Sequence, residues 1–144
     1  MSYKQPLVFN AKECKECSVP KGWGHEIIFE NNELYCGKLL CFKAGAKFSM
    51  HFHAVKDETW YVLDGLFTVI SIETTNADQI TTVLKPGDTW RNKPLEPHQL
   101  ICVEEGTIIE VSTADSVEDN YRVGPGDSQN KKEKNDEPKE NIPG

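Results

Sequence analysis

Residues 45–65 read GAKFSMHFHAVKDETWYVLDG, and the rest of the chain is organised around this stretch. His51 and His53 are two residues apart, so in a β-strand both imidazoles point to one face, with their Cα atoms ~7 Å apart. Glu58 follows after AVKD, which is long enough for a short bend back toward the same point. The stretch therefore predicts a strand whose end carries clustered metal-binding side chains.

A second stretch, residues 86–100 (PGDTWRNKPLEPHQL), contributes His98 to the same cluster. Two or three histidines with one carboxylate form a typical ligand set for Zn, Mn, Fe or Ni, and they leave coordination positions open for a small molecule. The alternative is an exposed strand face carrying two histidines, with the glutamate in water. We expect a divalent metal ion held by His51, His53, Glu58 and His98, and the sequence does not distinguish among the four metals.

These residues occupy every fixed position of a known motif. The order glycine, five residues, His-x-His, four residues, glutamate, six residues, glycine is filled by Gly45, His51, His53, Glu58 and Gly65. The chain thus resembles the cupins, although residues 93–95 read KPL where the second cupin motif often has Pro-x-Gly. The resemblance implies an all-β fold, the double-stranded β-helix or jelly-roll-like barrel of cupins.

The spacing of apolar runs also favours an all-β domain. Short runs rich in β-branched residues alternate with Gly, Pro and Asn turn signals, as in a sandwich or barrel. We expect turns at Asp64-Gly65 and Glu105-Gly106, and no amphipathic helix of any length. The chain divides into an irregular lead (1–20), a cupin domain (21–123) and a disordered charged tail (124–144), whose deletion after Gly126 is expected to leave stability unchanged.

Composition limits the classes of function. The 144 residues carry a net charge of −7, with 38% hydrophobic and 27% charged residues, which fits one globular domain and disfavours a nucleic-acid role. No apolar run approaches the ~20 residues of a membrane span, and the first ten residues do not resemble a signal peptide. We therefore expect a cytoplasmic protein that binds no membrane.

The five cysteines do not indicate a disulfide framework. Their number is odd, and no secretory signal is evident. Cys14 and Cys17 form a CKEC sequence without a second pair to complete a zinc knuckle, so we expect surface thiols, with a metal clip shared between subunits as the alternative. Cys36, Cys41 and Cys102 lie in strand-like runs and are expected to be small core residues.

Three local features resemble the type II phosphomannose isomerases. These are KGWGHE at 21–26, ETW at 58–60 and IEVSTADSVEDNYR at 109–122. The chain departs from that family at Lys21-Gly22, where Arg-Pro is usual, at Lys56-Asp57, where Arg-Ala is usual, and at His51, where Gln is frequent. The resemblance implies a sugar or sugar-phosphate isomerase or epimerase that works through a metal-stabilised enediolate.

Such a reaction requires a base and binding groups near the metal. Glu58 is a candidate base if it binds the metal loosely, and the other candidates are Asp57, Tyr61 and a metal-bound hydroxide. Trp60 shares strand parity with Glu58 and is expected either to line the pocket or to pack in the core. Candidate phosphate-binding cations, each of which is otherwise a surface charge, are Lys56, Arg91 and Arg122.

Other functions remain compatible with the same ligands. An iron-dependent dioxygenase-type cupin uses a similar set, and a metal- and sugar-binding cupin without catalytic activity would retain it. A metal-dependent lyase of the kind that acts on dimethylsulfoniopropionate is a further alternative. In each case the expected partner is a small molecule, and the resemblance implies a homodimer.

Overall fold

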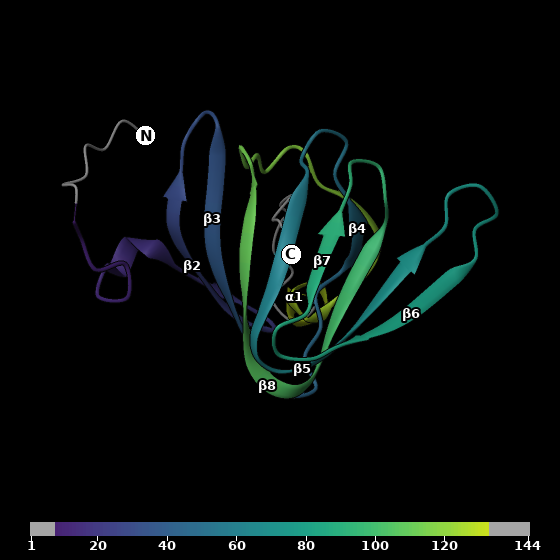
Figure 1. Cartoon of the computed structure of the whole chain (residues 1–144), viewed down its shortest axis with the longest axis horizontal. Helices are drawn as coiled ribbons and strands as arrows, with labels where there is room; N and C mark the ends of the chain where they lie inside the picture. The colour runs from purple at the N-terminus through teal and green to yellow at the C-terminus, as the bar shows by residue number, and fades with distance from the viewer. Residues whose placement is uncertain (1–7, 133–144) are drawn as a thin grey trace.

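The computed structural model describes residues 8–132 of the chain. Within this range the chain forms a curled antiparallel sheet, which confirms the all-β prediction (Figure 1). No helix in the described part of the chain is long and apolar enough to cross a membrane. The elements in chain order are η1 (Lys15–Cys17), β1 (Ser18–Lys21), β2 (Gly24–Asn31), β3 (Tyr35–Phe42), β4 (Met50–Phe52), β5 (Glu58–Ile72), β6 (Gln79–Leu84), β7 (Thr89–Asn92), β8 (His98–Thr113), β9 (Tyr121–Gly124) and α1 (Asp127–Lys132).

Two long strands, β5 and β8, form the backbone of the sheet. They pair antiparallel from Glu58 opposite Ser112 to Ser71 opposite His98. Strands β3, β2 and β1 extend the sheet from β8 in that order. Strand β4 pairs with β8 at His98, the first residue of β8, and β9 pairs with β4. Strands β6 and β7 both pair with β5. Figure 1 shows the sheet folded into a V-shaped half-barrel, with the bends of β5 and β8 at its base.

The bend lies where the sequence predicted two turns. Asp64-Gly65 and Glu105-Gly106 are not hairpin turns, because β5 and β8 each continue through them, and the register shifts there. Gly65 has φ +86°, and a Cβ on it would lie 2.6 Å from the Cα atom of Gly106. The two glycines therefore allow both strands to bend at the same point, and Asp64 Oδ1 accepts a hydrogen bond from the Thr107 amide (2.8 Å).

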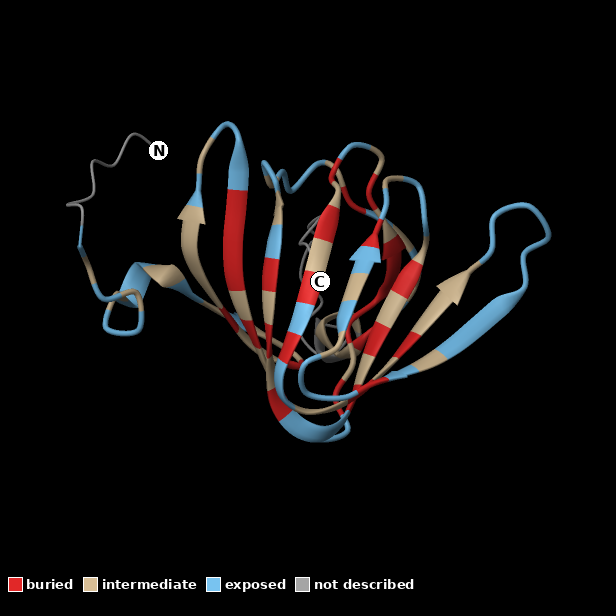
Figure 2. Cartoon of the chain, viewed as in Figure 1, coloured by how far each residue is buried: buried red, intermediate tan, exposed pale blue. Residues whose placement is uncertain are grey.

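Buried residues lie in bands along the strands of the half-barrel and alternate with more exposed ones (Figure 2). Alternate residues of β5 are buried, as expected for a strand with one face toward the core. Trp23 stacks on Phe42 with ring centroids 4.3 Å apart, and Phe48 meets Trp60 edge to face at 5.8 Å. Burying each of these side chains contributes roughly 1.5–3 kcal/mol. The buried apolar cluster consists of Trp23, Leu40, Phe42, Ala46, Phe48, Trp60, Val62, Phe67, Val69, Leu84, Leu100, Cys102 and Ile108.

The described parts of the predicted lead and of the predicted tail contain regular structure. The lead expected over residues 1–20 ends in η1 and in β1, which pairs with β2. The tail expected over residues 124–144 begins with the end of β9 and with α1, where Asp127 Oδ2 accepts a hydrogen bond from the Lys47 amide (3.0 Å). Ser128 Oγ likewise accepts one from the Gly22 amide (3.0 Å). Residues 133–144, the rest of the predicted tail, lie outside the described residues.

The cysteine prediction was partly wrong. Cys14 and Cys17 form a disulfide across η1, because one tight turn brings their Cα atoms to 5.3 Å, within the range that a disulfide spans. Cys36 and Cys102 are buried free thiols, as expected, whereas Cys41 is half-buried. Burial raises the pKa of Cys36 and of Cys102 to about 11, so both remain neutral thiols.

Candidate metal centre

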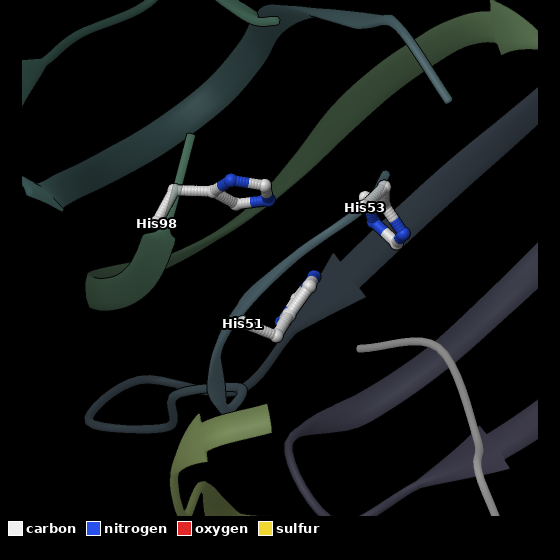
Figure 3. Close-up of side chains that lie close together, drawn as sticks. All are labelled: His51, His53 and His98. Carbon is white, nitrogen blue, oxygen red and sulfur yellow. The ribbon is translucent and has the colours of Figure 1, made fainter. Parts of the chain in front are cut away.

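Three histidines from two distant segments meet on the inner face of the half-barrel. His51 lies in β4 opposite His98, the first residue of β8, and His53 follows β4 directly. One nitrogen of each ring lies within 4.8 Å of those of the other two, and all three side chains are buried. Figure 3 shows the three imidazoles converging on one point. The predicted clustering of these histidines is confirmed.

Backbone carbonyl groups orient each ring. The Nδ1 atoms of His51, His53 and His98 lie 2.8, 2.5 and 2.9 Å from the carbonyl oxygens of Ser49, Asp119 and Glu96, respectively. Because a carbonyl oxygen can only accept, each Nδ1 carries a proton, and in the neutral ring the Nε2 atom then presents a lone pair. A carbonyl on the far nitrogen is the usual support of a metal-binding histidine.

Glu58, which begins β5, supplies the carboxylate of the cluster. Its Oε1 atom lies 3.1 Å from His98 Nε2 and 3.9 Å from His53 Nε2. His98 Nε2 is buried and has no hydrogen-bond partner among the described residues. Two lone-pair-bearing atoms thus face each other in a buried site, an arrangement that a cation between them would stabilise. The donor set therefore fits a divalent metal ion.

The protonation states also suit a metal. Burial lowers the pKa of His51 well below its ordinary value, with the neighbouring histidines adding to the effect, and burial lowers that of His53. Burial alone would raise the pKa of Glu58, but the Lys56 ammonium group holds it well below its usual range. The site thus offers neutral imidazoles at His51 and His53 and an ionised carboxylate at Glu58, the forms that bind metal ions.

Asn92 and Lys56 hold the Glu58 carboxylate in place. The Asn92 side-chain amide donates a hydrogen bond to Oε1 (3.2 Å), and Lys56 Nζ lies 3.4 Å from Oε2. No sequence motif singles out Asn92 as a site residue. Its position at the end of β7, opposite Glu58 in the ladder, places it there.

Lys56 lies in the interior rather than at an open phosphate site. Its ammonium group lies 3.0 Å from both Glu110 Oε2 and Asp115 Oδ1, in addition to its contact with Glu58. Burial by itself lowers the pKa of Lys56, but these carboxylates raise it well above its ordinary value. Three carboxylates therefore already neutralise the cation that the sequence assigned to phosphate.

Asp57, Tyr61 and Arg91 do not join the histidines. Asp57 makes a paired contact with the Arg91 guanidinium (3.0 and 2.6 Å) at the surface, and Tyr61 is 43% exposed. Strand alternation explains this result, because Glu58 and Trp60 point inward and their neighbours point outward. The predictions of Asp57 and Tyr61 as bases and of Arg91 as a phosphate ligand therefore lack geometric support.

The two remaining predicted residues differ in position. Trp60 is buried, packs edge to face on His98 at 5.6 Å, and donates its indole N–H to Glu110 Oε1 (3.2 Å). It therefore lines the site and belongs to the core, which combines both interpretations of this residue. Arg122 lies in β9 opposite His51, half-buried, and burial lowers its pKa.

Sequence reasoning missed the acidic residues that surround Lys56. Glu110 lies within the apolar run IIEV, at a position whose side chain points inward like that of Ile108. A carboxylate at such a position is unusual and could have identified this residue from the sequence. Burial, and then the charge of Glu58, raise the pKa of Glu110 to about 7. Asp119 was missed as well; its carboxylate accepts hydrogen bonds from the Ala54 and Lys56 amides (2.6 and 2.9 Å) and so fixes the loop between His53 and Glu58.

A small cavity of about 20 Å³ adjoins the cluster, a volume that holds roughly one water molecule. Apolar side chains form part of its wall, and charged and metal-binding side chains form the rest. The lining residues are Trp23, Glu26, Lys38, Leu40, Phe48, His51, His53, Lys56, Glu58, Trp60 and Glu110. His51, His53, Glu58 and the buried lysines Lys38 and Lys56 therefore face one common space.

The family model of the cupin domain matches residues 38–112. The chain is a cupin. Its predicted fold and motif are thereby confirmed, whereas the closer resemblance to type II phosphomannose isomerases stays a prediction. No curated protein matches this cupin by sequence.

Solved structures resemble this cupin in fold. Oxalate decarboxylase from Bacillus subtilis matches with a TM-score of 0.64 at 18% identity, over 74% of this chain and 29% of that one. The formate complex of oxalate decarboxylase from Lactobacillus farciminis matches with a TM-score of 0.69 at 16% identity, over 85% of this chain and 38% of that one. This cupin thus spans well under half the length of these enzymes, and the similarity shows the fold alone.

Proposed function

We propose that this cupin is a metal-dependent enzyme that moves a proton between neighbouring carbons of a small hydroxycarbonyl compound, such as a sugar or sugar phosphate. The observation that carries the proposal is the buried cluster of His51, His53, His98 and Glu58, of which His51, His53 and Glu58 line the adjoining cavity. A divalent ion bound there supplies Lewis-acid stabilisation of negative charge that develops on substrate oxygens.

The residues around the cavity supply the remaining requirements. Glu110 lines the cavity, and its pKa of about 7 lies near working pH, as a general base requires. As a base, Glu110 takes a proton from the carbon bearing the hydroxyl and returns it to the neighbouring carbonyl carbon, while the hydroxyl proton passes to the former carbonyl oxygen. Lys56 and the Trp60 indole hold the Glu110 carboxylate in position. Glu58 is the alternative base, although its contacts favour a role as ligand.

The test is proton NMR in heavy water with metal-loaded protein. Fructose 6-phosphate, mannose 6-phosphate and their unphosphorylated sugars are incubated beside a chelator-treated control. We expect deuterium to enter next to the carbonyl in at least one sugar, only in the metal-loaded sample. No exchange with any compound, in protein shown to hold one metal per chain, would exclude this reaction for the panel.

The size of the cavity favours a second candidate, an iron-dependent oxygen-using cupin. About 20 Å³ accommodates a ligand of one or two heavy atoms without movement of the walls, whereas a sugar requires the walls to open. Oxygen uptake by protein loaded with Fe²⁺, with a Zn²⁺-loaded control, tests this candidate. Ligand binding without exchange or oxygen uptake would indicate a cupin that binds metal and sugar without catalysis.

The identity of the metal and the assembly are also proposals. Manganese centres occur in the oxalate decarboxylase of Bacillus subtilis, which makes Mn²⁺ a reasonable first ion to test here beside Zn²⁺, Fe²⁺ and Ni²⁺. A homodimer in the cytoplasm remains our expectation. Light scattering of the full chain, measured over a range of concentrations, tests the dimer directly.

A further inference from the structure

Two buried lysines face the cavity beside the metal centre, and carboxylates hold both of them. Lys56 Nζ lies 3.0 Å from Glu110 Oε2, 3.0 Å from Asp115 Oδ1 and 3.4 Å from Glu58 Oε2. An ammonium group has three N–H donors, and each of these three carboxylates can take one of them. Lys56 therefore has no donor left for an incoming anion.

Lys38 lines the same cavity and is held by two carboxylates. Its ammonium group lies 3.1 Å from Asp115 Oδ2 and 3.5 Å from Glu26 Oε1, and its side chain is 3% exposed. Asp115 bridges the two lysines, with one oxygen on each. The lysines thus belong to one network in which carboxylates already neutralise both cations.

Carboxylates, by contrast, outnumber ammonium groups on the cavity wall. Glu26, Glu58 and Glu110 line it, together with Lys38 and Lys56 as the only cations among its lining residues. A phosphate or carboxylate at the far end of a ligand would meet these buried carboxylates, and both lysines of the wall are already paired with carboxylates. The cost of such an uncompensated charge is large in a buried site.

From this network we infer that the cavity is selective for uncharged, oxygen-rich ligands and disfavours ligands that carry a phosphate or carboxylate group away from the metal. The inference rests on the proposed metal centre, and it narrows the proposed substrate from sugars and sugar phosphates to unphosphorylated hydroxycarbonyl compounds. Lys38 and Lys56 then act on specificity indirectly, through the carboxylates that they hold in place.

The first test compares two ligands that differ only in one phosphate group. Protein loaded with Co²⁺ is titrated with dihydroxyacetone and with dihydroxyacetone phosphate at pH 8, and binding is followed by the visible absorption of the cobalt. We expect the phosphate ester to bind at least about tenfold more weakly. Equal or tighter binding of the ester would overturn the inference, as would a failure of dihydroxyacetone to bind. Cobalt content after each titration shows that neither ligand removes the metal.

The second test alters the network. Asp115→Asn leaves Lys56 and Lys38 each with one carboxylate fewer, so the affinity for dihydroxyacetone phosphate should rise roughly tenfold while that for dihydroxyacetone changes little. Arg91→Gln is the matched control, because it breaks an ion pair at the surface instead. An unchanged ratio of the two affinities in Asp115→Asn would contradict the inference. Glu26→Gln, which frees a Lys38 donor, replaces this variant if Asp115→Asn does not fold.

These tests are independent of turnover. A protein that prefers dihydroxyacetone but shows no deuterium exchange would retain the inference and lose the isomerase proposal. A protein that exchanges deuterium only with sugar phosphates would lose the inference and retain the isomerase.

Discussion

Glu58 and His98 lie at opposite ends of the β5–β8 ladder, yet Glu58 Oε1 and His98 Nε2 are 3.1 Å apart. Glu58 pairs with Ser112 at one end of the ladder, and His98 pairs with Ser71 at the other. The ladder folds back on itself at Gly65 and Gly106, and this bend brings its two ends together. The metal centre is therefore a consequence of the bend.

The bend can be tested at Gly106. A Cβ at this position would lie 2.6 Å from the Gly65 Cα, in backbone that cannot move away, so Gly106→Ala should destabilise the protein by about 1–3 kcal/mol. The control is Gly124→Ala, where a Cβ would make an ordinary contact of 3.6 Å with Met50. Urea denaturation measures both. Equal stability of the two variants would show that the close approach of the glycines is unimportant.

Metal binding should depend on His53. Its ring is fixed by the Asp119 carbonyl and faces the other two histidines, so His53→Ala removes one oriented ligand. We expect the purified variant to lose stoichiometric metal, by elemental analysis after dialysis against a weak chelator. His25→Ala, which changes a histidine outside the cluster, should retain it. Full metal retention by His53→Ala would refute the ligand assignment.

The local motif could be read from the sequence, because its residues are close together in the chain. The spacing of His51, His53 and Glu58 was sufficient to predict their convergence. The bend was missed because Asp-Gly is a common hairpin turn, and nothing local indicates that β8 bends beside β5 at the same point. Glu110 and Asp115 were missed since their importance comes from contact with Lys56, more than fifty residues away in the chain.

The buried network should be costly to break. Lys56→Met removes the cation that faces Glu58, Glu110 and Asp115, so three buried carboxylates lose a partner. We expect a loss of roughly 3–5 kcal/mol in the free energy of unfolding, by urea denaturation of metal-free protein. Arg91→Gln should have no measurable effect, because its ion pair is exposed to solvent. A similar loss in both variants would mean that the buried ion pairs of Lys56 stabilise the fold no more than the exposed ion pair of Arg91.

Acid should destabilise the metal-free protein through its histidines. Burial lowers the pKa of His51 well below its ordinary value, so on acidification the unfolded chain takes up this proton first, near pH 6.5. Stability is then lost as the pH falls below about 6.5, by up to ~1.4 kcal/mol per pH unit for one such histidine. Glu110, whose pKa is raised, acts in the opposite direction over part of this range.

The comparison of wild type with His51→Gln isolates the effect of the histidine, since Glu110 is common to both proteins. Urea denaturation of chelator-treated protein at pH 7.5 and at pH 5.5 gives the two differences in stability. We expect the variant to lose less stability than the wild type between these two pH values. An equal loss in the two proteins would show that His51 is not held neutral in the fold.

The segment after β9 should contribute to stability, contrary to the expectation from composition. Asp127 and Ser128 accept hydrogen bonds from the Lys47 and Gly22 amides, and the Asp127 amide donates one to the Lys47 carbonyl (3.0 Å). Each such bond contributes about 0.5–1.5 kcal/mol. A chain that ends at Gly126 should therefore unfold at a lower temperature than one that ends at Lys132, by differential scanning calorimetry. Asp127→Ala in the full chain should reproduce part of the decrease, because it removes the carboxylate but leaves the backbone. Identical melting temperatures for all three proteins would mean that these contacts do not stabilise the fold.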